Sequence, residues 1–179
     1  MNKYPIIIVT LLLLVVMASG CVTNSSQQNQ TKTYAQNGIT FTYNGTWEIA
    51  NTTAPGTLAA VGDPNTVNPT TQSPNTFVII QKPSVATGTD LQTAYNQNYA
   101  TFFNNTGNQR VSEGSVTVNN VNAFENVYTT SSGGVQKQMR AVWIPFNGNI
   151  YVILCGAIPS DYNNQQKNFD LIINSFKGT

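Results

Sequence analysis

The side chains that could support catalysis or metal binding are few and lie far apart in the sequence. The chain of 179 residues has eight Lys and Arg, seven Asp and Glu, and no His. Without histidine there is no Ser–His or Cys–His pair and no histidine-ligated zinc site. Five carboxylates are candidate ligands or bases, but no two have a spacing that gathers them for metal binding or paired-carboxylate catalysis: Asp63, Glu113, Glu125, Asp161 and Asp170. The sequence therefore predicts a protein that is not an enzyme, with no catalytic residue, no metal site and no cofactor.

The low charge also limits the class of partner. Charged residues make up 8% of the chain, whereas an average soluble protein is about a quarter charged. Solubility must come from uncharged polar residues, of which asparagine contributes 24. So few basic side chains leave no patch for a phosphate backbone, so we expect no nucleic-acid partner.

Two further features that could do chemistry also have structural explanations. Cys155 lies in an apolar run and is typical of a core residue; a reactive thiol is the alternative. A disulfide between Cys155 and Cys21 would require a Cys21 without lipid. Gly133-Gly134 lacks the lysine of a phosphate-binding loop and indicates a hairpin turn.

Cys21 follows a segment that resembles the signal peptide of a lipoprotein. Lys3 precedes an apolar run at residues 6–17, and Ala18, Ser19 and Gly20 come directly before the cysteine. The run is short for a membrane span, which needs about 20 residues. Ala18 departs from the usual pattern, in which leucine stands at this position. We expect cleavage before Cys21 and lipid attachment to Cys21; an uncleaved signal anchor and secretion without lipid are the alternatives.

These features divide the chain into three parts. Residues 1–20 are the predicted signal peptide, residues 21–34 a polar tether led by the cysteine, and residues 35–179 one domain. The protein would then lie at the cell membrane, lipid-anchored on the extracytoplasmic face. We expect it to contact the membrane through the lipid and not through the surface of the domain.

The domain shows a strand-rich pattern with two helices. Alternating apolar residues predict a strand around residues 39–43, a turn at Asn44-Gly45 and a second strand around 47–49. Another strand is expected at 58–61, before a breaker-rich loop at 62–76. A buried strand is expected at 76–83, and hairpin-linked strands at 109–118, 121–131, 135–146 and 149–158, with turns at Asn119-Asn120, Gly133-Gly134 and Asn147-Gly148. Residues 149–158 have apolar side chains in both alternating sets, which predicts a central strand covered on both faces.

Helical spacing favours one helix over residues 90–104, begun by Asp90, with one apolar face that includes Tyr95 and Tyr99. Another helix is expected after Pro159, capped by Ser160 and with Asp161 in its first turn. Hairpin connections without parallel crossovers indicate an antiparallel sheet. The predicted fold class is therefore α+β: an α-β-α sandwich with a central antiparallel sheet of about six strands and two main flanking helices.

Several segments, in their order and spacing, resemble the PsbP domain. The opening at residues 41–48 (FTYNGTWE) is similar to the family's F-x-Y-P-x-x-W, with Asn44 in place of proline. Residues 77–83 (FVIIQKP), 133–142 (GGVQKQMRAV), 147–152 (NGNIYV) and the helix end at 174–176 (NSF) match later parts of the domain, so that the resemblance covers about residues 38–177. It implies a Mog1/PsbP-like sandwich; known members include extrinsic photosystem II subunits and surface lipoproteins. The metal-linked histidines of some plant members have no counterpart here, which puts photosystem function in doubt.

The expected function is a non-enzymatic, lipid-anchored binding or accessory protein that docks on a membrane or envelope protein. One alternative is a small-ligand carrier or weak hydrolase with a pocket between sheet and helix, in which Glu125 or Asp170 would be the base. Another is a photosystem II accessory protein, if the organism is photosynthetic. Asn44 and Asn104 lie in N-x-S/T sequences and are the candidate glycosylation sites. We expect most of five aromatic residues to be core and one or two to be exposed for recognition: Trp47, Tyr128, Trp143, Phe146 and Tyr151.

Overall fold

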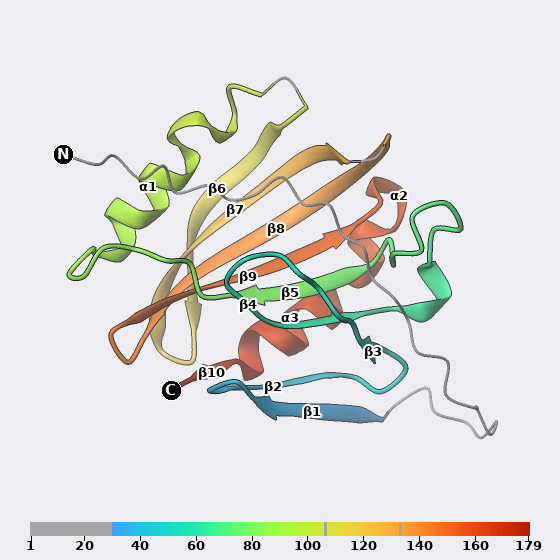
Figure 1. Cartoon of the computed structure of the whole chain (residues 1–179), viewed down its shortest axis with the longest axis horizontal. Helices are drawn as coiled ribbons and strands as arrows, with labels where there is room; N and C mark the ends of the chain where they lie inside the picture. Colours follow the sequence, from blue (N-terminus) through green and yellow to red (C-terminus); the bar gives the residue numbers. More distant parts are fainter. Residues whose placement is uncertain (1–29, 106, 133) are drawn as a thin grey trace.

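A large antiparallel sheet forms the centre of the computed structural model, which describes residues 30–105, 107–132 and 134–179 (Figure 1). Within these residues the sheet has seven strands in the order β3-β4-β5-β9-β8-β7-β6. This confirms the predicted antiparallel α+β class. The strands are β3 (Glu48–Ile49), β4 (Thr57–Gly62), β5 (Phe77–Gln81), β6 (Gln109–Val118), β7 (Val121–Ser132), β8 (Val135–Phe146) and β9 (Asn149–Ala157).

The four strands from β6 to β9 follow one another through tight hairpins, as the turn residues predict. Asn119 and Asn120 have φ of 50° and 64°, and Asn147 and Gly148 have φ of 48° and 74°. Positive φ at both central residues is the signature of the turn that matches the twist of paired strands, and asparagine and glycine tolerate it best. These turns fix the register of the hairpins, in which Val118 faces Val121 and Phe146 faces Asn149.

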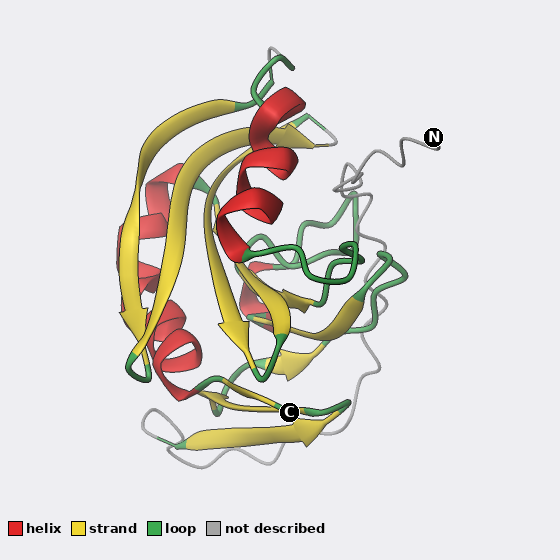
Figure 2. Cartoon of the chain, turned by 90° about the vertical axis from the view of Figure 1, so that its left-hand side faces the viewer, coloured by secondary structure: helices red, strands yellow, loops and turns green. Residues whose placement is uncertain are grey.

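Helices cover both faces of the sheet, which makes the predicted α-β-α sandwich (Figure 2). On one face α1 (Leu91–Phe102) packs against side chains that include Trp143 and Val152. On the other face α3 (Gln166–Ser175) packs against the alternate set, including Ile153. Both alternating sets of β9 are buried, as predicted for a central strand.

The two helices begin differently. The side chain of Asp90 accepts a hydrogen bond of 2.8 Å from the Thr93 amide, so Asp90 caps α1 as predicted. The prediction that Ser160 caps the last helix is wrong: α2 (Pro159–Tyr162) begins at Pro159, and the capping position is Ile158, which makes no side-chain hydrogen bond. Proline suits the first helical position because its missing amide would have had no helical partner. A 3₁₀ turn, η2 (Asn163–Gln165), then connects α2 to α3.

A small sheet adds to the domain a segment that we predicted to be tether. β1 (Thr31–Gln36), β2 (Ile39–Asn44) and β10 (Lys177–Gly178) pair in the order β1-β2-β10. The domain therefore includes residues 31–34, which the prediction assigned to the tether. Tyr34 explains the difference, since its buried ring stacks on Phe41 with centroids 5.0 Å apart and its hydroxyl donates to the Leu58 carbonyl. Tyr34 and the pairing with β2 from Thr31 to Gln36 together hold this otherwise polar strand in place.

The strand predicted around residues 47–49 forms, but it pairs elsewhere. We expected a hairpin with residues 39–43, whereas β3 pairs with β4, placing Ile49 opposite Val61. Trp47 precedes β3 and is 1% exposed, with its ring edge-on to Phe169 of α3. The buried ring of Trp47 lies where the chain passes from β2 of the small sheet to β3 of the large one. No helix of the described residues is long and apolar enough to cross a membrane.

Candidate functional site

The predicted modification sites differ in their surroundings. Cys21 lies outside the described residues, so its lipid attachment stays a prediction. Asn44 ends β2, where its amide donates to Asn168 Oδ1 over 3.0 Å and its own oxygen accepts from the Thr46 amide. Asn104 follows α1 and is exposed. Asn104 is therefore the freer of the two candidate glycosylation sites.

Arg140 gathers two carboxylates that are far apart in the sequence. Its Nε donates to Glu125 Oε2 over 2.6 Å, and its Nη1 donates to Asp170 Oδ1, also over 2.6 Å. Glu125 belongs to β7, Arg140 to β8 and Asp170 to α3, so the contact links both strands to the helix. Glu125 and Asp170 are far apart in the sequence, but the fold brings both against Arg140, so the interpretation that they are scattered is wrong. We call Arg140, Glu125 and Asp170 the arginine cluster.

The electrostatics of the arginine cluster favour a structural role over a catalytic one. Burial alone would lower the pKa of Arg140, but the hydrogen bonds that it donates to Asp170 and Glu125 outweigh burial, so the pKa is raised. The guanidinium stays charged and occupies an oxygen of each carboxylate. Both carboxylates are therefore held in ion pairs with Arg140. Sequence reasoning missed the cluster, although a charged residue in an apolar strand, as Arg140 is in β8, signals a buried partner.

Cys155 lies in β9 directly opposite Arg140 in the sheet register and has no exposed surface. Burial raises the pKa of the thiol well above its usual value, so the thiol stays protonated. The thiol is free, and its position confirms the predicted core residue. A protonated and inaccessible thiol is a poor nucleophile.

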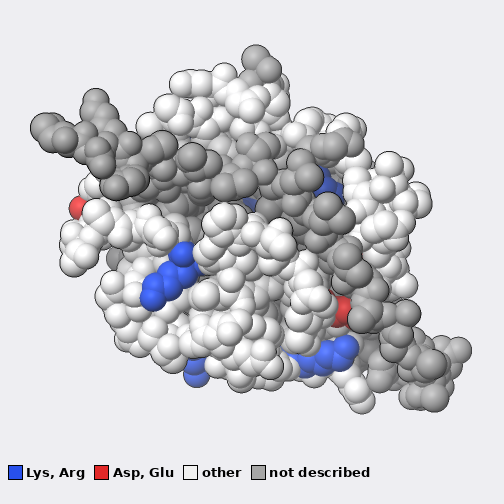
Figure 3. Space-filling model, viewed as in Figure 1, with Lys and Arg blue, Asp and Glu red and all other residues white. Residues whose placement is uncertain are grey.

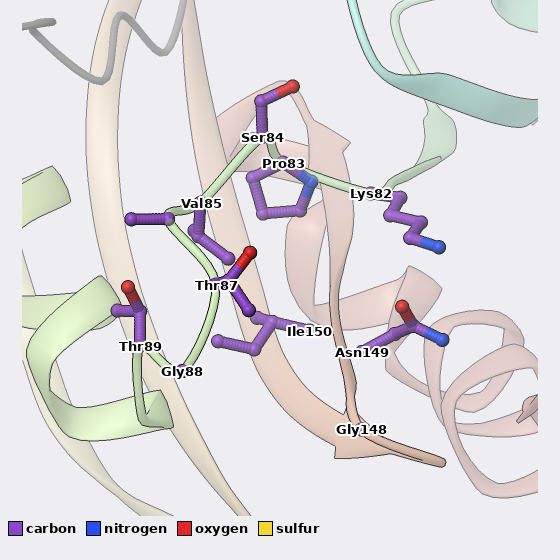
Figure 4. A pocket seen from close by; sticks show the side chains of 11 residues that line it. Lys82, Pro83, Ser84, Val85, Thr87, Gly88, Thr89, Gly148, Asn149 and Ile150 are labelled. Atoms are coloured by element: carbon purple, nitrogen blue, oxygen red, sulfur yellow. The ribbon is translucent and has the colours of Figure 1, made fainter.

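A shallow cavity of about 500 Å³ lies between the loop after β5 and the hairpin of β8 and β9 (Figure 4). Val85, Thr87 and Ile150 lie near one another at its centre, whereas Lys82 points away. Its lining, residues 82–89 and 148–150, provides hydroxyl and amide groups but includes no Asp or Glu. Glu125 and Asp170 are not part of it, so this cavity lacks the base that the hydrolase alternative requires.

The aromatic residues singled out from the sequence are mostly core, as predicted. Trp47, Tyr128, Trp143 and Tyr151 are each at most 5% exposed, and Phe146 is half-buried. In the described part of the chain, no group of three or more His, Cys, Asp or Glu could hold a metal ion. The described geometry thus assembles a packed scaffold with one charged cluster.

A family model described as "PsbP-like protein" matches residues 6–178. The chain belongs to the PsbP-like family. A comparison with curated proteins gives no match. Two solved structures share the fold of this PsbP-like domain, and both are too different in sequence to indicate more than the fold.

The first is the solution structure of cyanobacterial PsbP (CyanoP) from Synechocystis sp. PCC 6803. It has a TM-score of 0.62 and 11% identity, and the match covers 90% of this chain and 98% of that one. The second is the crystal structure of LpqN from Mycobacterium tuberculosis, described as involved in cell envelope biogenesis. Here the TM-score is 0.57 and the identity 15%, with coverage of 84% and 91%.

Proposed function

We propose that this PsbP-like protein is a non-enzymatic accessory protein, anchored by a lipid on Cys21 to the extracytoplasmic face of the membrane, where it binds a membrane or envelope protein. The anchor is supported by the apolar run at residues 6–17 and the small residues before Cys21. LpqN, which shares the fold, is described as involved in cell envelope biogenesis, and a location at the envelope is compatible with this proposal.

The arginine cluster is the observation that carries the non-enzymatic part. Glu125 and Asp170 were the carboxylates best placed to act as a base, and both are bound to Arg140. Cys155 is buried, and the chain has no histidine. The hydrolase alternative therefore lacks a base in the described cavity. The photosystem accessory role stays a second candidate, which rests on the PsbP-like family and is conditional on a photosynthetic host.

Membrane fractionation of cells that express the full chain tests the anchor. We expect the wild type to stay in the membrane fraction through washes with high salt and carbonate, and Cys21→Ser to become soluble. Cys155→Ala is the matched control, because it removes the other cysteine and should stay membrane-bound. A Cys21→Ser protein that resists the carbonate wash would contradict the lipid anchor.

Crosslinking in intact cells tests the accessory role. Membranes from cells with the wild-type protein should yield a reproducible crosslinked membrane or envelope protein. The Cys21→Ser protein, which would lie away from the membrane, should give it at much lower yield. Absence of any reproducible partner, or equal yield from both proteins, would count against the proposal.

A further inference from the structure

The start of β1 limits how far the domain can lie from the lipid. Nine residues separate Cys21 from Thr31, so the two ends of this segment can be at most about 35 Å apart. The Gly45 amide donates to the Gln30 carbonyl over 2.7 Å, which ties the entry of the chain to the turn after β2. If Cys21 carries lipid, as proposed above, the surface beside Gly45 is held near the membrane.

An exposed apolar side chain lies beside this entry. Lys32 Nζ donates to the Trp47 carbonyl over 3.2 Å, directly before β3. Ile49, the second residue of β3, is 54% exposed. Among the described residues, only Ile49 and Val111 are large apolar side chains with such exposure, and Val111 belongs to β6 at the opposite edge of the sheet.

The loop after Ile49 carries no charge and has a lysine at each end. Residues 49–62 contain no Asp, Glu, Lys or Arg, and Pro55 is exposed within them. The Lys82 amide donates to the Gly56 carbonyl over 2.8 Å, so Lys82 lies where the loop ends and Lys32 lies where it begins. Both lysines are exposed. In Figure 3 few Lys, Arg, Asp or Glu side chains lie among the described residues on this face.

We propose that Ile49 and the loop of residues 50–56, with Lys32 and Lys82 at its ends, contact the headgroup region of the membrane that holds Cys21. Apolar side chains favour the boundary between headgroups and acyl chains, and lysines are attracted to anionic lipid. This adds a protein contact to the lipid contact expected from the sequence. It rests on the proposed lipid anchor, since two lysines and one isoleucine would bind a membrane weakly unless a tether kept them close.

A lipid-depth measurement on the full lipoprotein tests this surface. A bimane label is placed at Ile49→Cys, or at Val111→Cys as the matched control, because both positions are exposed and Cys155 is buried. The labelled proteins are reconstituted in vesicles of phosphatidylcholine and phosphatidylglycerol that contain a spin-labelled lipid. We expect quenching severalfold stronger at position 49 than at position 111. The additional change of Lys32 and Lys82 to Gln should reduce quenching at position 49.

Flotation of the same vesicles separates this inference from the anchor on which it rests. A protein that does not float contradicts the lipid anchor itself. A protein that floats but shows equal quenching at positions 49 and 111 leaves the anchor intact and overturns the membrane-facing surface. Because these vesicles hold no other protein, quenching at position 49 cannot come from a docking partner. Quenching that does not change with the lysine variants would contradict the proposed role of Lys32 and Lys82.

Discussion

The two edges of the seven-stranded sheet are built in different ways. At one edge β3 has two residues and follows Trp47, which is buried beneath α3. At the other edge β6 has ten residues, of which 109–115 are all exposed although successive residues point to opposite faces. The β3 edge is therefore tied to the core by the buried Trp47 that precedes it, whereas residues 109–115 of β6 lie outside the core.

The difference shows how each edge avoids unwanted strand pairing. The two residues of β3 are too few to pair with a strand of another molecule. β6 is long enough, but an irregular register and charged side chains hinder such pairing. The register shifts between Arg110 and Ser112, and Arg110 forms an ion pair of 2.6 Å with Glu113. Mutations should accordingly cost much stability near β3 and little within β6. The following predictions test this contrast.

Trp47→Ala should give the largest effect, a loss of about 3–5 kcal/mol in the free energy of unfolding, because it empties a large buried site between β3 and α3. Urea unfolding followed by circular dichroism measures it. A loss below about 1 kcal/mol would mean that Trp47 does not hold the β3 edge.

Gly45→Ala should lower the free energy of unfolding by about 1–3 kcal/mol, because a Cβ at this position would collide with the Gln30 carbonyl. Gly114→Ala in β6 is the matched control, since nothing lies within 4 Å of a Cβ there. The control should change stability by less than about 0.5 kcal/mol. Similar losses for both variants, measured by the same urea titration, would mean that β6 is packed as tightly as the turn that leads to β3.

Asp90→Ala should lower the free energy of unfolding by less than Gly45→Ala does. Asp90 caps α1, whose Tyr95 and Tyr99 contact β7, the strand next to β6. Hydrogen bonds from the Thr93 amide and hydroxyl lower the pKa of Asp90 below its ordinary value of 3.8. The stabilisation is thus present above pH 3.8 and is lost as the pH falls through the lowered pKa. Thermal unfolding between about pH 5 and pH 2 should show a weaker acid destabilisation in Asp90→Ala than in the wild type. Parallel curves for the two proteins would contradict the cap.

Val111→Ser should have the smallest effect, within about 0.5 kcal/mol, because the side chain is more than half exposed on β6. Urea unfolding beside the Trp47 variant gives the comparison directly. A loss above about 1 kcal/mol would indicate that Val111 is covered in solution, for example by another copy of the chain.

The sequence predicted the parts of the fold that depend on local pattern. Asn119-Asn120 and Asn147-Gly148 marked their hairpins, and the spacing of Tyr95 and Tyr99 marked the buried face of α1. It failed where one contact distant in sequence decides the structure. The polar segment of β1 is held in the small sheet by the ring of Tyr34, which stacks on Phe41. β3 pairs in the large sheet, and Trp47 directly before it packs on Phe169.

The arginine cluster has the same explanation. Arg140, Glu125 and Asp170 come from three elements, and only the register of β7 on β8 together with the packing of α3 brings them together. Spacing along the chain contains no such information. The burial of Cys155 could be predicted because its apolar neighbours in β9 already indicated a central strand.

The central claim is that the domain is held at the membrane by a lipid on Cys21. Mass spectrometry of the N-terminal peptide of protein purified from its own membranes tests this most directly. The account predicts a mature chain that begins at Cys21, lacks residues 1–20 and carries the added mass of lipid on the cysteine. An unmodified Cys21, or a chain that still begins at residue 1, would contradict it.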